Sequence, residues 1–169
     1  MNSQSTKILV AVVDASVLIQ IRGKANFSAS VGFKTVVQEL RQKGFTQFAL
    51  DLAECPLMDS TFIGVLAGQR LNMDSASSSK SCIKLFNASQ RIQEALDNMG
   101  IAHFFEFCSG VLGGTNYVET ATQASSKLEL TQTSLEAHQT LMSVNPANVA
   151  KFKDVAQFLA EDLQKLLNK

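Results

Sequence analysis

The chain has 169 residues, of which 46% are hydrophobic and 18% charged, a size that suits one domain with an appendage and is enough to bury a core. Fifteen Lys and Arg residues balance fifteen Asp and Glu residues, so no net charge attracts nucleic acid or an anionic membrane surface. The lack of Trp and the single Tyr also argue against a base-stacking surface, and nucleic acid is therefore not an expected partner.

Cysteine usage and hydropathy both indicate a soluble cytoplasmic protein. Cys55, Cys82 and Cys108 are odd in number and form no C-x-x-C pair, so we interpret them as small buried hydrophobic residues in a reducing compartment. The apolar stretch 8–21 is interrupted by Asp14 and is shorter than the roughly twenty apolar residues that span a bilayer. We expect no membrane insertion and no signal peptide.

The first elements are predicted to be a hairpin and a helix. Residues 8–13 and 16–21 are rich in β-branched residues and flank a turn at Asp14, which is typical of two antiparallel strands. From Asn26 the apolar residues follow helical spacing until Gly44, where a helix C-cap is expected.

A strand and a helix with a small-residue face follow. Residues 46–52 alternate between apolar and polar as a strand does, and 62–71 form an apolar stretch. Gly64 and Gly68 are four residues apart, so they share one helix face and allow a neighbouring backbone to approach closely.

Residues 82–86 and 101–107 are two further predicted strands. Between them lies a helix capped by Asn87 or Ser89 and ended by Gly100. The order β-β-α-β-α-β-α-β predicts an α/β fold with a mixed, mainly parallel sheet of about five strands and helices packed on it.

The carboxy-terminal part differs in character. Residues 1–110 form the predicted domain, 111–127 a polar linker and 128–169 a helical extension, with Asn145-Pro146 as the start of the last helix. That helix is amphipathic, and we expect its apolar stripe to pack on the same chain, with a second chain as the alternative. The stripe consists of Val149, Phe152, Val155, Ala156, Leu159, Leu163 and Leu166.

The segment Asp59-Ser60-Thr61 precedes the apolar helix 62–71 and supplies three residues that can cap it. A helix amino terminus has unpaired N–H groups and about half a positive charge, which favour a bound phosphate. Phosphorylation there would add about −1.5 to −2 charges and could repel a docked partner without unfolding the helix.

The same segment carries a family resemblance. Leu50-Asp51-Leu52 and the run 58–66, Met-Asp-Ser-Thr-Phe-Ile-Gly-Val-Leu, resemble the STAS domain of bacterial anti-sigma factor antagonists, whose pattern is Asp-Ser-Ser/Thr-Gly-Leu/Ile-Gly. The resemblance covers roughly residues 7–107 by element order and is specific only around 50–66. In that family a serine kinase that is also the anti-sigma factor phosphorylates the first Ser.

The resemblance implies roles for individual residues. Asp59 matches the motif Asp, Ser60 the phosphorylated Ser and Thr61 the second hydroxyl residue, which we take as the alternative phosphorylation site. Phe62 departs from the pattern, because the family usually has Gly there. Its ring either enters the core or stands exposed, and we include Phe62 with the other three in the expected partner-binding surface.

The implied function is a phosphorylation-switched protein-binding module. Unphosphorylated at Ser60, it would bind a kinase-type anti-sigma factor, and after phosphorylation it would release that partner. The alternative is a non-switching STAS-like subunit of a larger assembly such as a membrane transporter. In that case the last helix would provide a permanent contact or a homodimer interface.

We do not expect an enzyme. A serine nucleophile needs a positioned base, but His103 falls in an apolar strand pattern and His138 on a helical stretch interpreted as solvent-facing. No G-x-S-x-G elbow, phosphate-binding glycine loop or metal-ligand spacing is present. We expect no catalytic residue, cofactor or metal.

Overall fold

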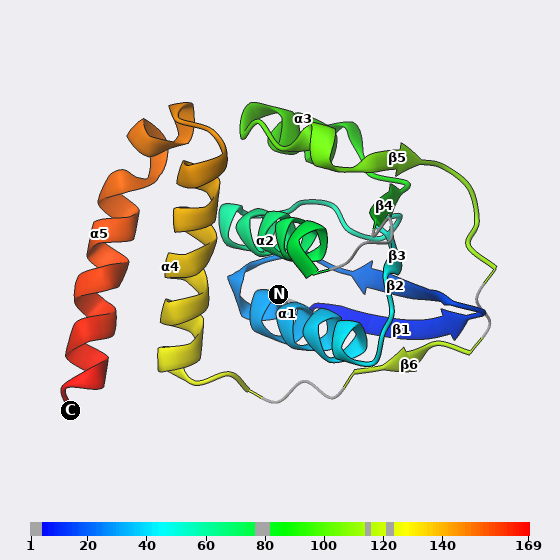
Figure 1. Cartoon of the computed structure of the whole chain (residues 1–169), viewed down its shortest axis with the longest axis horizontal. Coiled ribbons are helices and arrows are strands. Elements are labelled where there is room, and N and C mark those ends of the chain that lie inside the picture. Colours follow the sequence, from blue (N-terminus) through cyan, green and yellow to red (C-terminus); the bar gives the residue numbers. More distant parts are fainter. Residues whose placement is uncertain (1–4, 77–81, 114–115, 121–123) are drawn as a thin grey trace.

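A computed structural model describes residues 5–76, 82–113, 116–120 and 124–169. Its centre is a six-stranded sheet in the order β5-β4-β3-β2-β1-β6 (Figure 1). Strand β1 is antiparallel to both β2 and β6, whereas β2, β3, β4 and β5 are parallel. The strands are β1 (Lys7–Val13), β2 (Ser16–Arg22), β3 (Gln47–Asp51), β4 (Cys82–Phe86), β5 (Glu106–Cys108) and β6 (Val118–Glu119).

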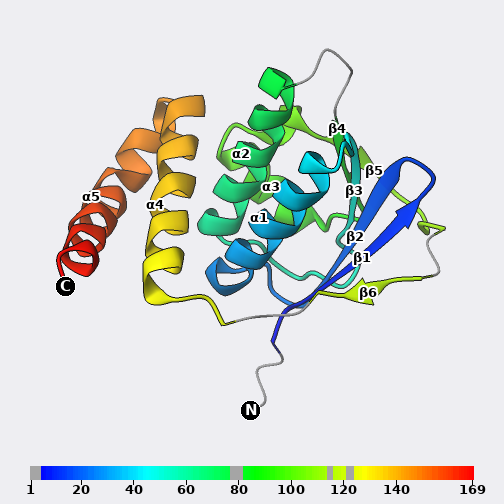
Figure 2. The same cartoon turned by 60° about the horizontal axis from the view of Figure 1, so that its bottom comes forward.

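The helices form successive layers on one side of this sheet. Figure 2 shows the sheet, then α1, α2 and α3, then α4, and α5 outermost. Helix α4 packs against α1, α2 and α5. The helices are α1 (Phe27–Gln42), α2 (Ser60–Ala76), α3 (Gln90–Asn98), α4 (Lys127–Val144) and α5 (Ala147–Leu167), with a short 3-10 segment at Ala102–Phe104.

The main hydrophobic core lies between the sheet and α1, α2 and α3, and it extends to Ala137 and Leu141 of α4. Ile19 and Leu50 from the strands meet Phe33 and Phe62 from the helices, and all four side chains are fully buried. Burial of one such side chain contributes roughly 1.5–3 kcal/mol, so this core holds α2 firmly against the sheet.

The opposite face of the sheet carries a smaller cluster. Ala11, Leu18 and Ala49 are buried there and pack with side chains that include Leu112 and Tyr117. The segment predicted as linker therefore covers part of this face.

Most predicted elements are confirmed. Asp14 lies at the hairpin turn with a φ of 54°, and Gly44 follows α1 with a φ of 99°. Ser89 caps α3 by accepting a hydrogen bond from the Ile92 N–H, and the Asn145 side chain accepts one from the Ala147 N–H at the start of α5.

Two predictions need correction. Residues 101–107 do not form one strand, because Ala102–Phe104 form a 3-10 turn before the short β5. The predicted linker 111–127 contributes β6, which pairs Leu9 with Glu119 and Val10 with Val118. This pairing covers the free edge of β1, and exposed strand edges are places where sheets otherwise aggregate.

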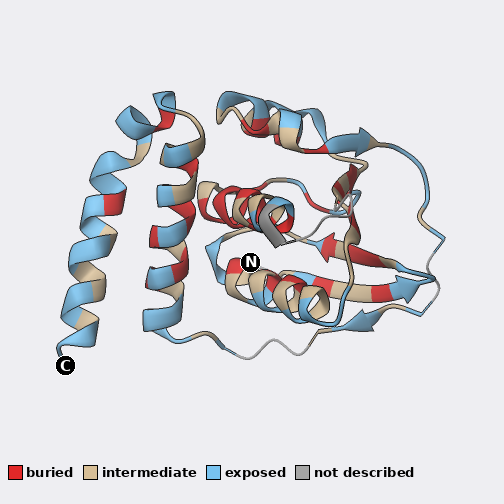
Figure 3. Cartoon of the chain, in the orientation of Figure 1, coloured by how far each residue is buried: buried red, intermediate tan, exposed pale blue. Residues whose placement is uncertain are grey.

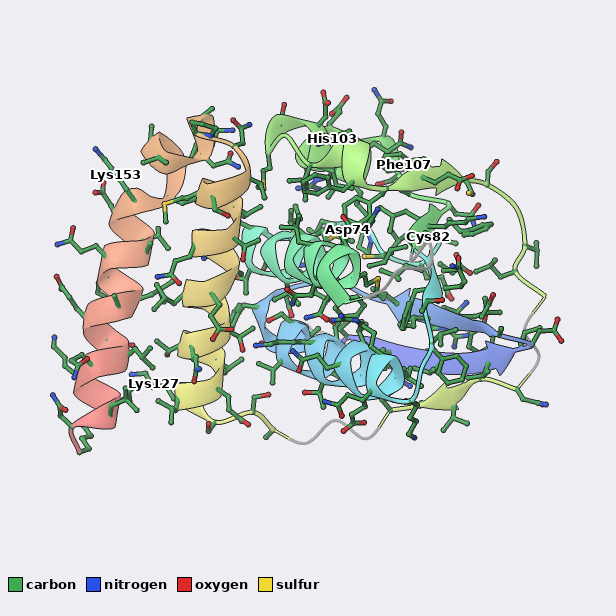
Figure 4. The ribbon with its side chains drawn as sticks, viewed as in Figure 1. Asp74, Cys82, His103, Phe107, Lys127 and Lys153 are labelled. Atoms are coloured by element: carbon green, nitrogen blue, oxygen red, sulfur yellow. The ribbon has the colours of Figure 1, made fainter. Side chains whose placement is uncertain are left out.

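The apolar stripe of α5 packs on α4, so the expected intramolecular packing is confirmed. Figure 3 shows several buried residues along α4, whereas α5 is mostly exposed. Val149 and Val155, at the margin of the stripe, are each more than 40% exposed. Lys153 points away from α4 on the outer side of α5 (Figure 4). Within the described residues, no helix has the length and apolar character needed to cross a membrane.

Candidate functional site

Asp59 connects the amino termini of two helices. Its Oδ1 accepts a hydrogen bond from the Phe62 N–H at 2.9 Å, and its Oδ2 accepts one from the Phe27 N–H at 2.7 Å. Phe27 is the first residue of α1 and Phe62 lies in the first turn of α2, so one carboxylate satisfies a free N–H group on each helix. The Asp59 N–H donates to the Ala25 carbonyl at 2.9 Å, which holds the loop in place.

Ser60, the first residue of α2, lies against α4. Its Oγ is 2.9 Å from Nε2 of His138, a residue that is 4% exposed. The prediction that His138 faces solvent is therefore wrong. His138 is buried because α4 is packed between α2 and α5.

The second ring nitrogen of His138 determines the direction of this hydrogen bond. Nδ1 lies 2.7 Å from the Ser134 carbonyl oxygen, which can only accept. In the neutral imidazole, Nδ1 therefore carries the hydrogen and Nε2 accepts the hydrogen bond that the Ser60 hydroxyl donates.

Thr61 also contacts α4. Its side chain is buried, and its Oγ1 forms a 3.0 Å hydrogen bond with the Oγ of Ser134. Nearby, the Lys34 Nζ of α1 forms a 2.9 Å ion pair with Glu136 of α4. Both hydroxyl groups of the predicted switch thus have partners on the carboxy-terminal extension.

Helices α2 and α4 approach each other closely at Gly64. A Cβ built on Gly64 would lie 2.7 Å from the Ala137 Cβ and closer still to the Ala137 carbonyl oxygen. One turn later, a Cβ built on Gly68 would lie 3.8 Å from the Thr140 Oγ1. The prediction that the Gly64 and Gly68 face allows a close neighbour is confirmed, and the neighbour is α4.

Phe62 belongs to the core. It is fully buried, and its ring centroid is 4.8 Å from that of Phe33. Of the two alternatives for this residue, the structure selects the buried one, so the Phe62 ring does not contribute to a partner-binding surface in this conformation. The neighbouring polar residues Asp59 and Ser60 are half-buried.

The other titratable candidates have structural partners. Asp51 accepts hydrogen bonds from the Ala53 N–H and the Asn87 side chain, and Glu54 forms an ion pair with Arg22. No cluster of three His, Cys, Asp or Glu side chains within the described part of the chain could hold a metal. His103 lies in the 3-10 segment beside α3, away from α4 (Figure 4).

The Ser60–His138 pair has the spacing of a nucleophile and a general base. A base of this kind is normally oriented by a carboxylate, but here a backbone carbonyl occupies that position. The small cavity between α1, α2 and α4, of about 180 Å³, is lined by neither residue. In this structure the Ser60–His138 pair joins α2 to α4.

Comparison with known proteins places the fold. No protein-family model and no curated protein sequence matches the chain. Among solved structures, a protein from Thermotoga maritima described as an anti-sigma factor antagonist is 18% identical, with a TM-score of 0.54, over 60% of this chain and 86% of that one. The antagonist SpoIIAA in its unphosphorylated form is 16% identical, with a TM-score of 0.52, over 59% and 86%.

An anti-sigma factor antagonist from Mycobacterium paratuberculosis is 12% identical, with a TM-score of 0.52, over 62% of this chain and 86% of that one. The chain therefore has the fold of anti-sigma factor antagonists, the STAS fold, as the motif around Ser60 predicted.

Proposed function

We propose that the protein is a phosphorylation-switched protein-binding module, with Ser60 as the phosphorylation site and Thr61 as the alternative. The observation that carries the proposal is the position of Ser60 at the Asp59-capped amino terminus of α2, on the fold of anti-sigma factor antagonists. The proposed partner is a cytoplasmic serine kinase of the anti-sigma factor type, bound when Ser60 is unphosphorylated.

The switch is electrostatic. The kinase transfers the terminal phosphoryl group of its nucleoside triphosphate to Ser60 Oγ, the hydroxyl proton is lost, and the diphosphate leaves. The product carries about −1.5 to −2 charges. The free N–H groups of the first turn of α2 stabilise this phosphate, but a partner that docked beside Asp59 now meets additional negative charge.

Mass spectrometry of the protein isolated from its native cells, with and without phosphatase treatment, tests this proposal. We expect one phosphate on Ser60. Ser60→Ala should keep the partner bound in a pull-down and Ser60→Asp should release it. Equal capture by the two variants would contradict the switch.

The second candidate is a fixed binding subunit of a larger assembly. It is favoured by the engagement of Ser60 with His138 and by the exposed apolar side chains Val155 and Phe158 on α5, which could join two copies or contact a permanent partner. This candidate predicts no phosphate on Ser60 under any growth condition. It also predicts a complex whose mass, measured by light scattering, falls when Phe158 is replaced by Asp.

A further inference from the structure

We propose that the hairpin of α4 and α5 is a displaceable cover that occupies the amino-terminal face of α2 and competes with any outside partner for it. In the docked state the cover withholds Ser60 and Thr61; in the undocked state it exposes them. The inference rests on the proposed function only for which outside protein competes with the hairpin. The cover itself is defined by contacts within the chain.

The first support is that α4 takes the place a partner would need. It contacts both hydroxyl groups of the switch, through His138 and Ser134. It also brings Ala137 against Gly64 at backbone distance. No helix of another protein can reach this face while α4 is present.

The second support is the number of buried polar residues on the helices that meet at this interface. Six of the seven buried polar residues of the described chain belong to α2, α4 or the first turn of α5. Interfaces that separate are more polar than permanent cores. These residues are Thr61, Gln69, Thr131, Thr133, His138 and Asn148.

The third support is incomplete packing. Gln69 and Asn148 each have a buried side-chain oxygen without a hydrogen-bond partner, and a buried polar group without a partner destabilises the docked state. Gln69 also lines the cavity of about 180 Å³ between α1, α2 and α4. Undocking hydrates these groups, so part of the cost of opening is recovered.

Phosphorylation and docking exclude each other at Ser60. A phosphoryl group that replaced the hydroxyl hydrogen in its present direction would overlap His138 Nε2, which lies 2.9 Å from Oγ. The His138 ring in turn packs edge-on against Phe152 of α5, with centroids 5.1 Å apart. Displacing the imidazole therefore disturbs both helices of the hairpin together, and a kinase reaches Ser60 only when the hairpin has opened.

The geometry also defines the chemistry of a competing partner. The face accepts a helix with a small residue opposite Gly64, as Ala137 is in the docked hairpin. Hydrogen-bonding groups on the same helix side would meet Ser60 and Thr61, as His138 and Ser134 do.

Thiol labelling of the full chain tests the cover without a kinase or partner. Ser60→Cys is introduced together with Cys82→Ser and Cys108→Ser, and its reaction with 5,5′-dithiobis-(2-nitrobenzoic acid) is timed. Adding Ala137→Arg, which overfills the contact with Gly64, should raise the labelling rate at least about tenfold, corresponding to about 1.4 kcal/mol of lost docking. The matched control, Ala160→Arg on an exposed position of α5, should leave the rate unchanged.

Equal labelling rates in the Ala137→Arg and Ala160→Arg proteins, both folded by circular dichroism, would overturn the inference. If Ala137→Arg does not fold, Glu136→Lys provides the milder opening variant, because it places two positive charges together at Lys34.

Hydrogen exchange of the unmodified protein provides an independent measurement. We expect amides of α4 and α5 to exchange together and at least tenfold faster than those of β2 and β3. Exchange of all four elements at one common rate would mean that the hairpin opens only on global unfolding, which contradicts the inference. Neither measurement involves phosphate, so a cover without any Ser60 phosphorylation would contradict the proposed function alone.

Discussion

The backbone of α2 at Gly64 lies against the carbonyl of Ala137, so close that a built Cβ would overlap the backbone of α4. This contact relates a residue of the family-like motif to a residue of the carboxy-terminal extension. A glycine at this position therefore serves helix packing, in addition to any role in binding a partner.

The Gly64→Ala variant should be destabilised. Alanine favours a helix over glycine by about 1 kcal/mol, but the overlap with Ala137 forces α4 to move, and overpacking costs typically about 1–3 kcal/mol. The matched variant is Gly32→Ala in α1, where an added Cβ would meet no atom within 4 Å. This substitution should raise the free energy of unfolding by roughly 0.5–1 kcal/mol. Urea unfolding measures both free energies, and a stabilised Gly64→Ala protein would contradict the described contact.

The Asp59→Ala variant should lose two caps at once. Each cap contributes typically ~1 kcal/mol, so we expect a loss of about 2 kcal/mol in the free energy of unfolding. Ser89→Ala, which removes the single cap of α3, should cost about half as much. Losses of the same size in both variants, compared by chemical denaturation, would show that Asp59 does not support α1 and α2 together.

The Phe62→Ala variant should be among the most destabilising in the chain. Removing a fully buried ring that contacts Phe33 leaves a cavity and costs about 3–5 kcal/mol. Phe158→Ala, at a position that is 68% exposed, should change the free energy of unfolding by less than about 0.5 kcal/mol. Similar small effects of the two changes in thermal unfolding would place Phe62 outside the core.

The three cysteines should differ in reactivity. Burial raises the pKa of the Cys55 thiol, so at pH 8 it holds less of the reactive thiolate. Cys82, labelled on the strand β4 in Figure 4, and Cys108 are only partly buried. Peptide mapping after brief thiol labelling should find both of these modified well before Cys55, and in denaturant all three at similar rates. Early modification of Cys55 in the native protein would contradict its burial.

Local sequence patterns predicted the turns and helix ends of the sheet-and-helix domain. Asp14 and Gly44 are at chain positions that require unusual backbone angles, and Ser89 caps a helix through its own side chain. Such signals depend on neighbours in the sequence, so they can be read from the sequence alone. The position of Ser60 at the start of α2 followed from the same kind of signal.

The surroundings of Ser60 could not be predicted in this way. His138 is 78 residues away in the chain, and its helix has two buried sides with only a weak apolar stripe. The one available signal is the recurrence of the polar residues Thr131, Ser134 and His138 at spacings of three and four residues, followed by Leu141 three residues later. Residues at these spacings share one helix face. Strand β6 was missed because two residues are too few to show alternation.

Strand β6 has a consequence for any protein that competes with the hairpin. Its pairing with β1 anchors the chain at Glu119, and only residues 120–126 separate that anchor from α4. A connection of this length keeps the undocked hairpin at an effective concentration on the order of millimolar near α2. An outside partner present at about 1 µM must therefore have an intrinsic affinity for the face roughly a thousandfold greater than that of the hairpin to occupy it half of the time.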